Sequence, residues 1–173
     1  MLKQYSILIL LTFTGLYGLK AQQKFGHMNS GNMLELMPEV AESDKKLAAL
    51  DDSLGVVLDT MAAKFKRNYD KALKAVNEGT MTKIQQSEAE QQLNEEQTKI
   101  TEFQKTAQLV LTQRRQILLA PVLDRLNAAI VEVGKEKGYS FIFDVSAGSM
   151  LYVNESDDVS PLVAAKLGVA MNK

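Results

Sequence analysis

The sequence predicts an α+β protein in which a long antiparallel coiled-coil helical hairpin projects from a small β-containing body. Three observations carry this prediction. Between residues 40 and 116 there is no proline, and the only aromatic residues are Phe65, Tyr69 and Phe103. Apolar residues recur there at spacings of three and four, and β-forming segments lie near both ends of the chain. We therefore expect an elongated protein rather than one compact globule.

The middle of the chain reads as two long helices with matching apolar seams. It is dominated by Ala, Leu, Glu, Gln and Lys, which are good helix formers. Spacings of three and four in the first helix place these residues on one stripe: Leu47, Leu50, Leu54, Val57 and Met61. In the second helix a heptad pattern joins Leu93, Ile100 and Ala107, and a second joins Phe103, Val110 and Ile117. These stripes predict two helices that pack along a narrow seam.

The chain is expected to turn back between residues 77 and 82. Asn77 and Gly79 suit the left-handed residue that ends a helix, and Thr82 with Gln85 resembles a capping box. A connection this short joins antiparallel helices. At about 1.5 Å per residue, an arm of roughly forty residues per helix would reach roughly 60 Å. Its charges balance, with 12 basic and 12 acidic residues between 42 and 115, as on a solvated helical surface.

The ends of the chain predict strands. Lys24 to Asn29 is a short strand candidate by apolar alternation, and Tyr139 to Val145 is rich in β-formers. After the turn residues 146–149, we expect Met150 to Val153 to return as an antiparallel partner in a strand hairpin.

Two helices should complete the body. Pro121 is expected to kink or interrupt the second long helix, whose apolar residues after it are Leu123, Leu126, Ile130 and Val133. Gly138 should end that helix. Ser160 and Pro161 have the chemistry of an N-cap residue and a first helical residue, so a short last helix is predicted after them. The predicted domains are a body from 22–37 and 122–173 and an arm from 38–121.

The first 21 residues have the outline of a secretory signal peptide. An early Lys3 precedes a short apolar stretch, and Ala21 offers a small residue for cleavage. Cleavage after Gly18 and retention as an uncleaved anchor are the alternatives. Removing Lys3 and Lys20 would leave 18 basic and 21 acidic residues, a net charge of −3. This balance does not favour nucleic acid as a partner. The chain contains no cysteine, which excludes disulfides, thiolate metal sites and a lipid-modified cysteine.

An enzymatic function is not predicted, and no catalytic residue, cofactor or metal site is assigned. His27 is the only histidine, and the chain has no catalytic triad order, phosphate-binding loop or two-histidine metal spacing. Asp144, Glu155, Asp157 and Asp158 form an acidic cluster, but they lack the alternating ligands of a calcium loop. We interpret them as solvated carboxylates.

These features together resemble the Skp/OmpH family. The resemblance rests on the export signal, the first strand Phe25 to Ser30, the long hairpin, and above all the run from Val131 to Gly148 with Glu136-Lys137-Gly138-Tyr139 inside it. It extends over residues 22–173. The resemblance implies a homotrimer in the periplasm of a Gram-negative bacterium, whose arms hold unfolded outer-membrane proteins without ATP. The best-known members are basic whereas this chain is slightly acidic, a departure that bears on the client type and on lipopolysaccharide contact.

Three sets of residues follow as candidates. Flexible apolar side chains repack against varied partners, so the client-binding candidates are Leu54, Val57, Leu58, Met61, Phe65, Leu73, Val76 and Met81. We expect most of them to form the hairpin seam, because each arm must first hold itself together. A basic contact patch, with transient membrane-surface contact as one use, would comprise Lys64, Lys66, Arg67, Lys71 and Lys74. The oligomerisation candidates are Phe25, Phe141, Phe143, Leu151 and Val153. The alternative hypothesis is an exported coiled-coil structural adaptor of the cell envelope.

Overall fold

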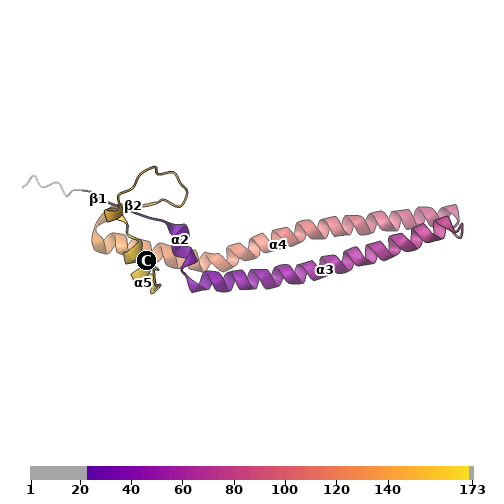
Figure 1. The fold of residues 1–173 in the computed structure, drawn as a ribbon, viewed down its shortest axis with the longest axis horizontal. Coiled ribbons are helices and arrows are strands. Elements are labelled where there is room, and N and C mark those ends of the chain that lie inside the picture. Colours follow the sequence, from indigo (N-terminus) through magenta and orange to yellow (C-terminus); the bar gives the residue numbers. More distant parts are fainter. Residues whose placement is uncertain (1–22, 172–173) are drawn as a thin grey trace, which may run out of the picture. The chain divides into compact units, whose positions relative to one another are not determined.

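The protein is an α+β chain, as the sequence predicts. The computed structural model describes residues 23–171, so the predicted signal peptide lies outside the described residues. The elements are β1 (Lys24–Met28), α2 (Ser30–Glu35), α3 (Pro38–Asn77), α4 (Lys83–Lys137), β2 (Tyr139–Asp144), the 3-10 turn η2 (Glu155–Asp157) and α5 (Ser160–Leu167) (Figure 1). Contacts divide the chain into two units. We call residues 34–126 the arm, and residues 23–33 together with 127–171 the body.

The arm is an antiparallel hairpin of α3 and α4 that share a continuous seam (Figure 1). The seam positions, which are buried or partly buried, recur at steps of three and four because 3.6 residues make one helical turn. On α3 they are Leu47, Leu50, Leu54, Leu58, Met61, Phe65, Asn68, Ala72 and Ala75. On α4 they are Gln86, Ala89, Leu93, Glu96, Ile100, Phe103, Ala107 and Leu111.

The seam departs from the predicted register at the same level on both helices. Leu58 replaces Val57, which is 43% exposed. On α4, Leu111 takes the place predicted for Val110, and Ile117 is exposed as well. On each helix, two successive spacings of four residues produce the shift, at 50–54–58 and at 103–107–111. An extra spacing of four locally unwinds the supercoil that a strict heptad pattern imposes. The heptad prediction was therefore wrong at Val57, Val110 and Ile117.

The end of the arm has the predicted turn chemistry. Gly79 has a φ of 65°, in the left-handed region where a side chain would be strained. The Thr82 amide donates to Gln85 Oε1 at 2.9 Å, and the Gln85 amide donates to Thr82 Oγ1 at 3.2 Å. This reciprocal pair is a capping box, and it satisfies backbone donors that the first turn of α4 would otherwise leave unpaired.

The sequence predicts that Pro121 kinks or interrupts α4, and the interruption does not occur. The helix continues through Pro121 to Lys137, and Gly138, with a φ of 69°, ends it as predicted. Val122 and Leu126, directly after the proline, are buried. Their packing outweighs the one backbone hydrogen bond that proline removes, since most helix stability in proteins comes from tertiary packing.

The sheet of the body consists of β1 and β2, which run parallel with Phe25 opposite Phe141 and His27 opposite Phe143. Gly26 and Met28 point to the buried side, whereas Phe25 and His27 point to the other. A Cβ on Gly26 would lie 2.8 Å from Val159 Cγ1, so only glycine allows Val159 to pack there.

The predicted strand hairpin is wrong. Met150 to Val153 forms no strand, and the partner of β2 is the N-terminal strand β1. Asp144 ends β2 by accepting hydrogen bonds from the Ser30 amide at 3.1 Å and the Ser146 amide at 2.9 Å. The chain then passes to the far side of β1, where the Val159 amide donates to the His27 carbonyl at 2.9 Å. Strand β1 thus lies between β2 and the segment around Val159.

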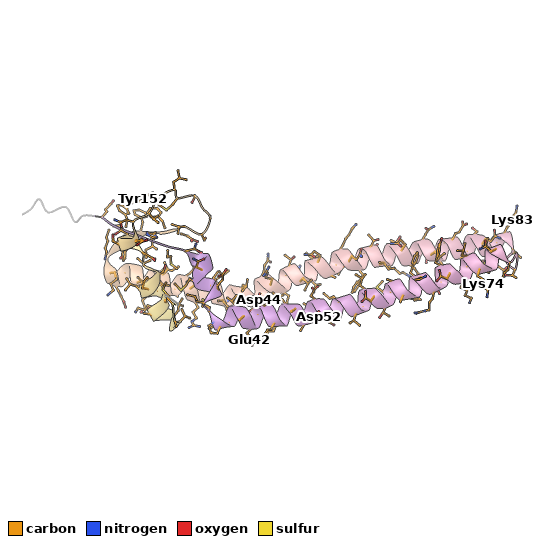
Figure 2. All side chains as sticks on the ribbon, in the orientation of Figure 1. Glu42, Asp44, Asp52, Lys74, Lys83 and Tyr152 are labelled. Atoms are coloured by element: carbon orange, nitrogen blue, oxygen red, sulfur yellow. The ribbon has the colours of Figure 1, made fainter. Side chains whose placement is uncertain are left out.

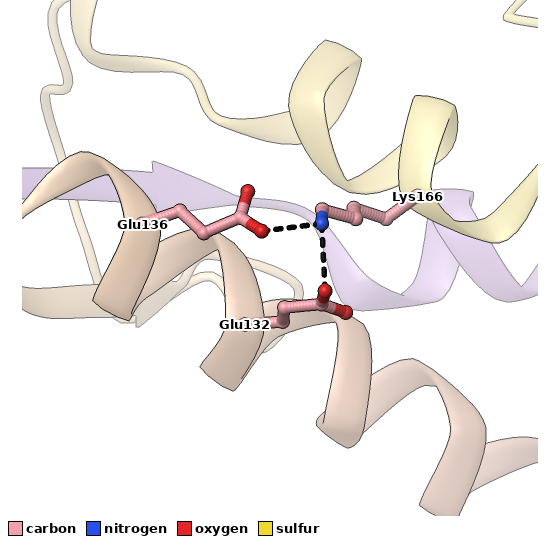
Figure 3. Close-up of polar contacts among 3 residues, drawn as sticks. All are labelled: Glu132, Glu136 and Lys166. Atoms are coloured by element: carbon pink, nitrogen blue, oxygen red, sulfur yellow. Dashed lines mark hydrogen bonds and ion pairs between the residues drawn. The ribbon is translucent and has the colours of Figure 1, made fainter.

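Helix α5 packs beside the last turns of α4. Lys166 Nζ lies 2.7 Å from Glu132 Oε1 and 2.7 Å from Glu136 Oε1 (Figure 3). Ser160 is the first helical residue rather than the predicted N-cap, and its amide donates to Asp158 Oδ1 at 2.8 Å. The buried apolar residues of the body are Met28, Met33, Ala129, Val133, Val159, Val163, Ala164 and Leu167.

Candidate functional site

The outer face of the body's sheet is aromatic and open to solvent. The Phe25 and Phe141 rings stack with centroids 5.9 Å apart, and Phe143 lies 6.4 Å from Phe25 and 6.1 Å from Phe141. All three side chains are more than 40% exposed. Parallel sheets are usually covered on both faces, so a face of three stacked phenylalanines is typical of a surface that a partner covers.

The loop after β2 adds exposed apolar side chains to the body. Leu151 is fully exposed and Tyr152 is 82% exposed, and Figure 2 shows Tyr152 on this loop. Val153 is partly buried. The five predicted oligomerisation residues therefore lie in two places, the aromatic sheet face and this loop, rather than on one strand hairpin.

The predicted client-binding residues divide into two groups on the arm. Val57, Leu73 and Val76 are exposed outside the seam, at 43%, 47% and 43%. The others are partly buried positions of the hairpin: Leu54, Leu58, Met61, Phe65 and Met81. Only the first group has enough free surface to contact another molecule without opening the arm.

The distal third of α3 carries three parallel stripes. The seam stripe consists of Phe65, Asn68, Ala72 and Ala75. The residues that directly precede these seam residues in the sequence form a stripe that we call the basic flank: Lys64, Arg67, Lys71 and Lys74. The residues that directly follow the last three seam residues form a stripe that we call the apolar flank: Tyr69, Leu73 and Val76. Because one residue rotates about 100° around the helix, the two flanks lie on opposite sides of the seam.

Tyr69 was not among the binding residues predicted from the sequence, although its spacing from Leu73 and Val76 places it on the same helix face as those two residues. Tyr69, Leu73 and Val76 follow the i, i+4, i+7 pattern of one helix face. Tyr69 is 48% exposed, and its ring stacks on Phe65 with centroids 6.3 Å apart. This contact makes the apolar flank continuous with the seam. Lys66 lies at the near end of the same face and pairs with Asp70 at 2.9 Å.

The predicted basic patch is therefore split between two sides of α3. Lys64, Arg67, Lys71 and Lys74 share the basic flank, whereas Lys66 stands beside the apolar flank. Figure 2 shows Lys74 and Lys83 at the distal end, where α3 gives way to α4. Lys64 pairs with Glu96 at 3.4 Å and Lys74 with Glu78 at 3.8 Å. Both partners of the Lys74 pair are exposed, and exposed pairs of this kind are weak.

A polar layer crosses the seam between Asn68 and Glu96. Asn68 Nδ2 donates to both carboxylate oxygens of Glu96, at 2.8 Å and 3.0 Å, and the Glu96 side chain is only 13% exposed. The hydrogen bonds from Asn68 are the main cause that lowers the pKa of Glu96, with contributions from Gln92 and Lys64. A charged seam residue is satisfied here by partners from both helices.

Asp144 and Asp158 of the acidic cluster, and His27, have structural partners. Asp144 accepts the Ser30 hydroxyl at 2.5 Å, and Asp158 accepts the Ser160 amide. His27 Nε2 lies 2.9 Å from the Asn154 carbonyl. Within residues 23–171, His, Cys, Asp and Glu form no group of three that could hold a metal ion. Over the same residues, none of the helices has an apolar stretch long enough to cross a membrane.

Comparisons with known proteins agree with the fold. The model of the family described as outer membrane protein (OmpH-like) matches residues 24–167. A solved structure of a candidate OmpH-like outer membrane chaperone from Caulobacter crescentus superposes with a TM-score of 0.68, and covers 85% of each chain at 16% identity. A comparison with curated proteins gave no match. Because the family model spans well over half of the chain, this protein belongs to the OmpH-like family.

Proposed function

We propose that this protein is an ATP-independent holdase chaperone that binds unfolded outer-membrane proteins in the periplasm and keeps them soluble during transit. The observation that carries this proposal is the arm itself. It holds exposed apolar side chains outside its seam, on helices whose other exposed residues are mostly charged or polar. A holdase requires such a surface, because many weak apolar contacts must coexist with solubility.

Membership of the OmpH-like family supports a chaperone role. The apolar signal at residues 1–21 supports export, and we propose that the protein acts in the periplasm of a Gram-negative bacterium. The exposed apolar and basic flanks of the arm favour binding as its activity.

We further propose that the body assembles three copies through its aromatic sheet face. The exposed stack of Phe25, Phe141 and Phe143 supports this proposal. Burial of these rings against another copy of the chain would remove apolar surface from water and so favour association. Three arms around one client would multiply weak contacts by avidity. Single arms would release an unfolded chain quickly.

The test measures mass and protection together. The mature protein is analysed by light scattering, alone and with an outer-membrane β-barrel protein diluted from urea, without ATP. A discrete trimer that keeps the barrel protein soluble supports the proposal. A monomer or dimer that leaves the barrel protein to aggregate overturns it.

The second candidate is an exported structural adaptor, favoured by the length and charge balance of the arm. An adaptor would hold one stable partner and would not discriminate unfolded from folded chains. Binding of several unrelated unfolded proteins with similar affinity excludes the adaptor, whereas stable capture of a single folded envelope protein favours it.

A further inference from the structure

The apolar flank is the exposed feature of the distal arm that the hairpin's own packing does not explain. Tyr69, Leu73 and Val76 each keep more than 40% of their surface exposed although apolar residues stand directly beside them in the seam. In the distal half of α4, from Lys83 to Leu111, the exposed large apolar residues are Ile84, Leu109 and Val110, which do not share a stripe with one another.

The two helices of the distal arm therefore differ in surface chemistry. A shallow hollow on α4 is lined by eight polar side chains between Ser87 and Glu102. Residues 83–98 of α4 carry one basic and four acidic residues, a net charge of −3. On α3, the seam separates the apolar flank from the basic flank. Only one side of the arm offers a continuous apolar contact.

The size of the apolar flank argues against a permanent partner. Three partly exposed side chains supply a small fraction of the roughly 800 Å² per partner that a stable protein interface buries. A contact of this size suits a short-lived association with a flexible chain. The continuity of the flank with the seam through the Phe65 and Tyr69 rings gives it a rigid base.

The spacing of the flank indicates which kind of chain fits. At about 1.5 Å per residue, Tyr69 and Leu73 are roughly 6 Å apart along the helix, and Tyr69 and Val76 roughly 10 Å. In an extended polypeptide, alternate residues on one side are about 6.6 Å apart. Transmembrane β-strands alternate apolar and polar residues with this period. An extended segment laid along α3 would place its apolar side chains against Tyr69 and Leu73.

We propose that the apolar flank of α3 is the arm's contact surface for extended polypeptide segments with alternating apolar residues, and that the basic flank is not. This inference rests on the proposed function and adds the place of contact and the sequence pattern that it selects. The polar residues of such a segment would face away from the arm and remain hydrated.

The first experiment uses the absence of cysteine in the chain. Leu73→Cys and Lys71→Cys each carry a unique thiol on opposite flanks two residues apart, and both are labelled with a photoactivatable maleimide. The full mature protein is then mixed with a urea-diluted β-barrel protein. We expect crosslinks to the client from position 73 and at least about fivefold fewer from position 71. Equal yields, or crosslinks from position 73 only to a second copy of this chain, overturn the inference.

The second experiment tests the pattern with two labelled peptides of identical composition, one alternating apolar and polar residues and one with the apolar residues in a block. We expect the alternating peptide to bind several-fold more tightly by fluorescence anisotropy. Tyr69→Ser with Leu73→Ser should weaken that binding about tenfold, because tens of Å² of apolar contact disappear. Equal binding of the two peptides overturns the proposed pattern.

Matched controls separate this inference from the proposed function. Ile84→Ser with Leu109→Ser removes exposed apolar residues of α4, and Arg67→Glu with Lys71→Glu changes the basic flank. Both control variants should bind the alternating peptide as the unchanged protein does. If the unchanged protein fails to protect any client, the proposed function fails. If it protects clients and the flank variant protects equally well, only the flank assignment is overturned. Helical circular dichroism verifies that each variant retains its arm.

Discussion

Asn68 on α3 donates two hydrogen bonds to Glu96 on α4, and this pair replaces an apolar layer in the distal part of the seam. A carboxylate that is only 13% exposed is stable there because its oxygens are paired. The layer also fixes which residues of the two helices face each other, as a polar residue at a coiled-coil core position commonly does.

Removing one partner of this layer should cost more than removing both. We expect Asn68→Leu to lower the free energy of unfolding by about 1–3 kcal/mol, because Glu96 loses its main donor. Asn68→Leu with Glu96→Leu should recover most of that loss, since an apolar layer suits the seam. Urea denaturation followed by circular dichroism measures both. Asn94→Leu, the same change at an exposed position of α4, serves as the control. Equal losses in the single and double variants would contradict this explanation.

The body should lose stability in acid through Asp144. Partial burial raises the pKa of Asp144, but hydrogen bonds from Ser30 and Ser146 outweigh it and lower the pKa from 3.8 to about 2. Because the folded pKa lies below the unfolded one, the ionised carboxylate stabilises the fold above pH 4, and this contribution disappears as the pH falls toward 2. Asp144→Asn should flatten the decline in melting temperature over that range. Asp59→Asn, an exposed change on α3, should leave the slope as it was.

The end of the arm should depend on its capping box. Thr82→Ala removes the oxygen that accepts the Gln85 amide, and we expect a loss of about 0.5–2 kcal/mol in the free energy of unfolding. Thr112→Ala is the matched control, because its hydroxyl donates to the Gln108 carbonyl within the middle of α4. Hydrogen exchange at residues 83–86 should accelerate in the first variant only. If hydrogen exchange at residues 83–86 were equally fast in both variants, the loss of stability would come from a change in helix propensity and not from the capping box.

The aromatic sheet face should control assembly. Phe141→Ser with Phe143→Ser removes two rings of the exposed stack, and we expect the mass by light scattering to fall toward that of one chain. Leu109→Ser with Ile117→Ser removes comparable exposed area from the arm, and it should leave the mass unchanged. A stable trimer in the first variant would place the contact between copies elsewhere.

Local sequence signals located most elements. The glycines at 79 and 138, the capping box at Thr82 and Pro38 at the first turn of α3 each define an element end by backbone chemistry. The predicted seam positions are confirmed except at Val57, Val110 and Ile117, where steps of four displace the heptad. Asn68 and Glu96, in the distal part of the seam, were not predicted. Tyr69 was missed because it lies one position off the seam, and its exposure depends on the final register.

The sequence alone determined the α+β class, the two long helices and the turn between them, because periodicity, helix propensity and caps act over a few residues. The tertiary structure decided what depends on distant partners. Strand β2 pairs with β1, more than a hundred residues earlier, rather than with Met150 to Val153. Helix α4 continues through Pro121, and the buried side chains of Val122 and Leu126 directly after the proline hold it in place. Long-range packing energies of this kind outweigh local preferences, and no short segment contains them.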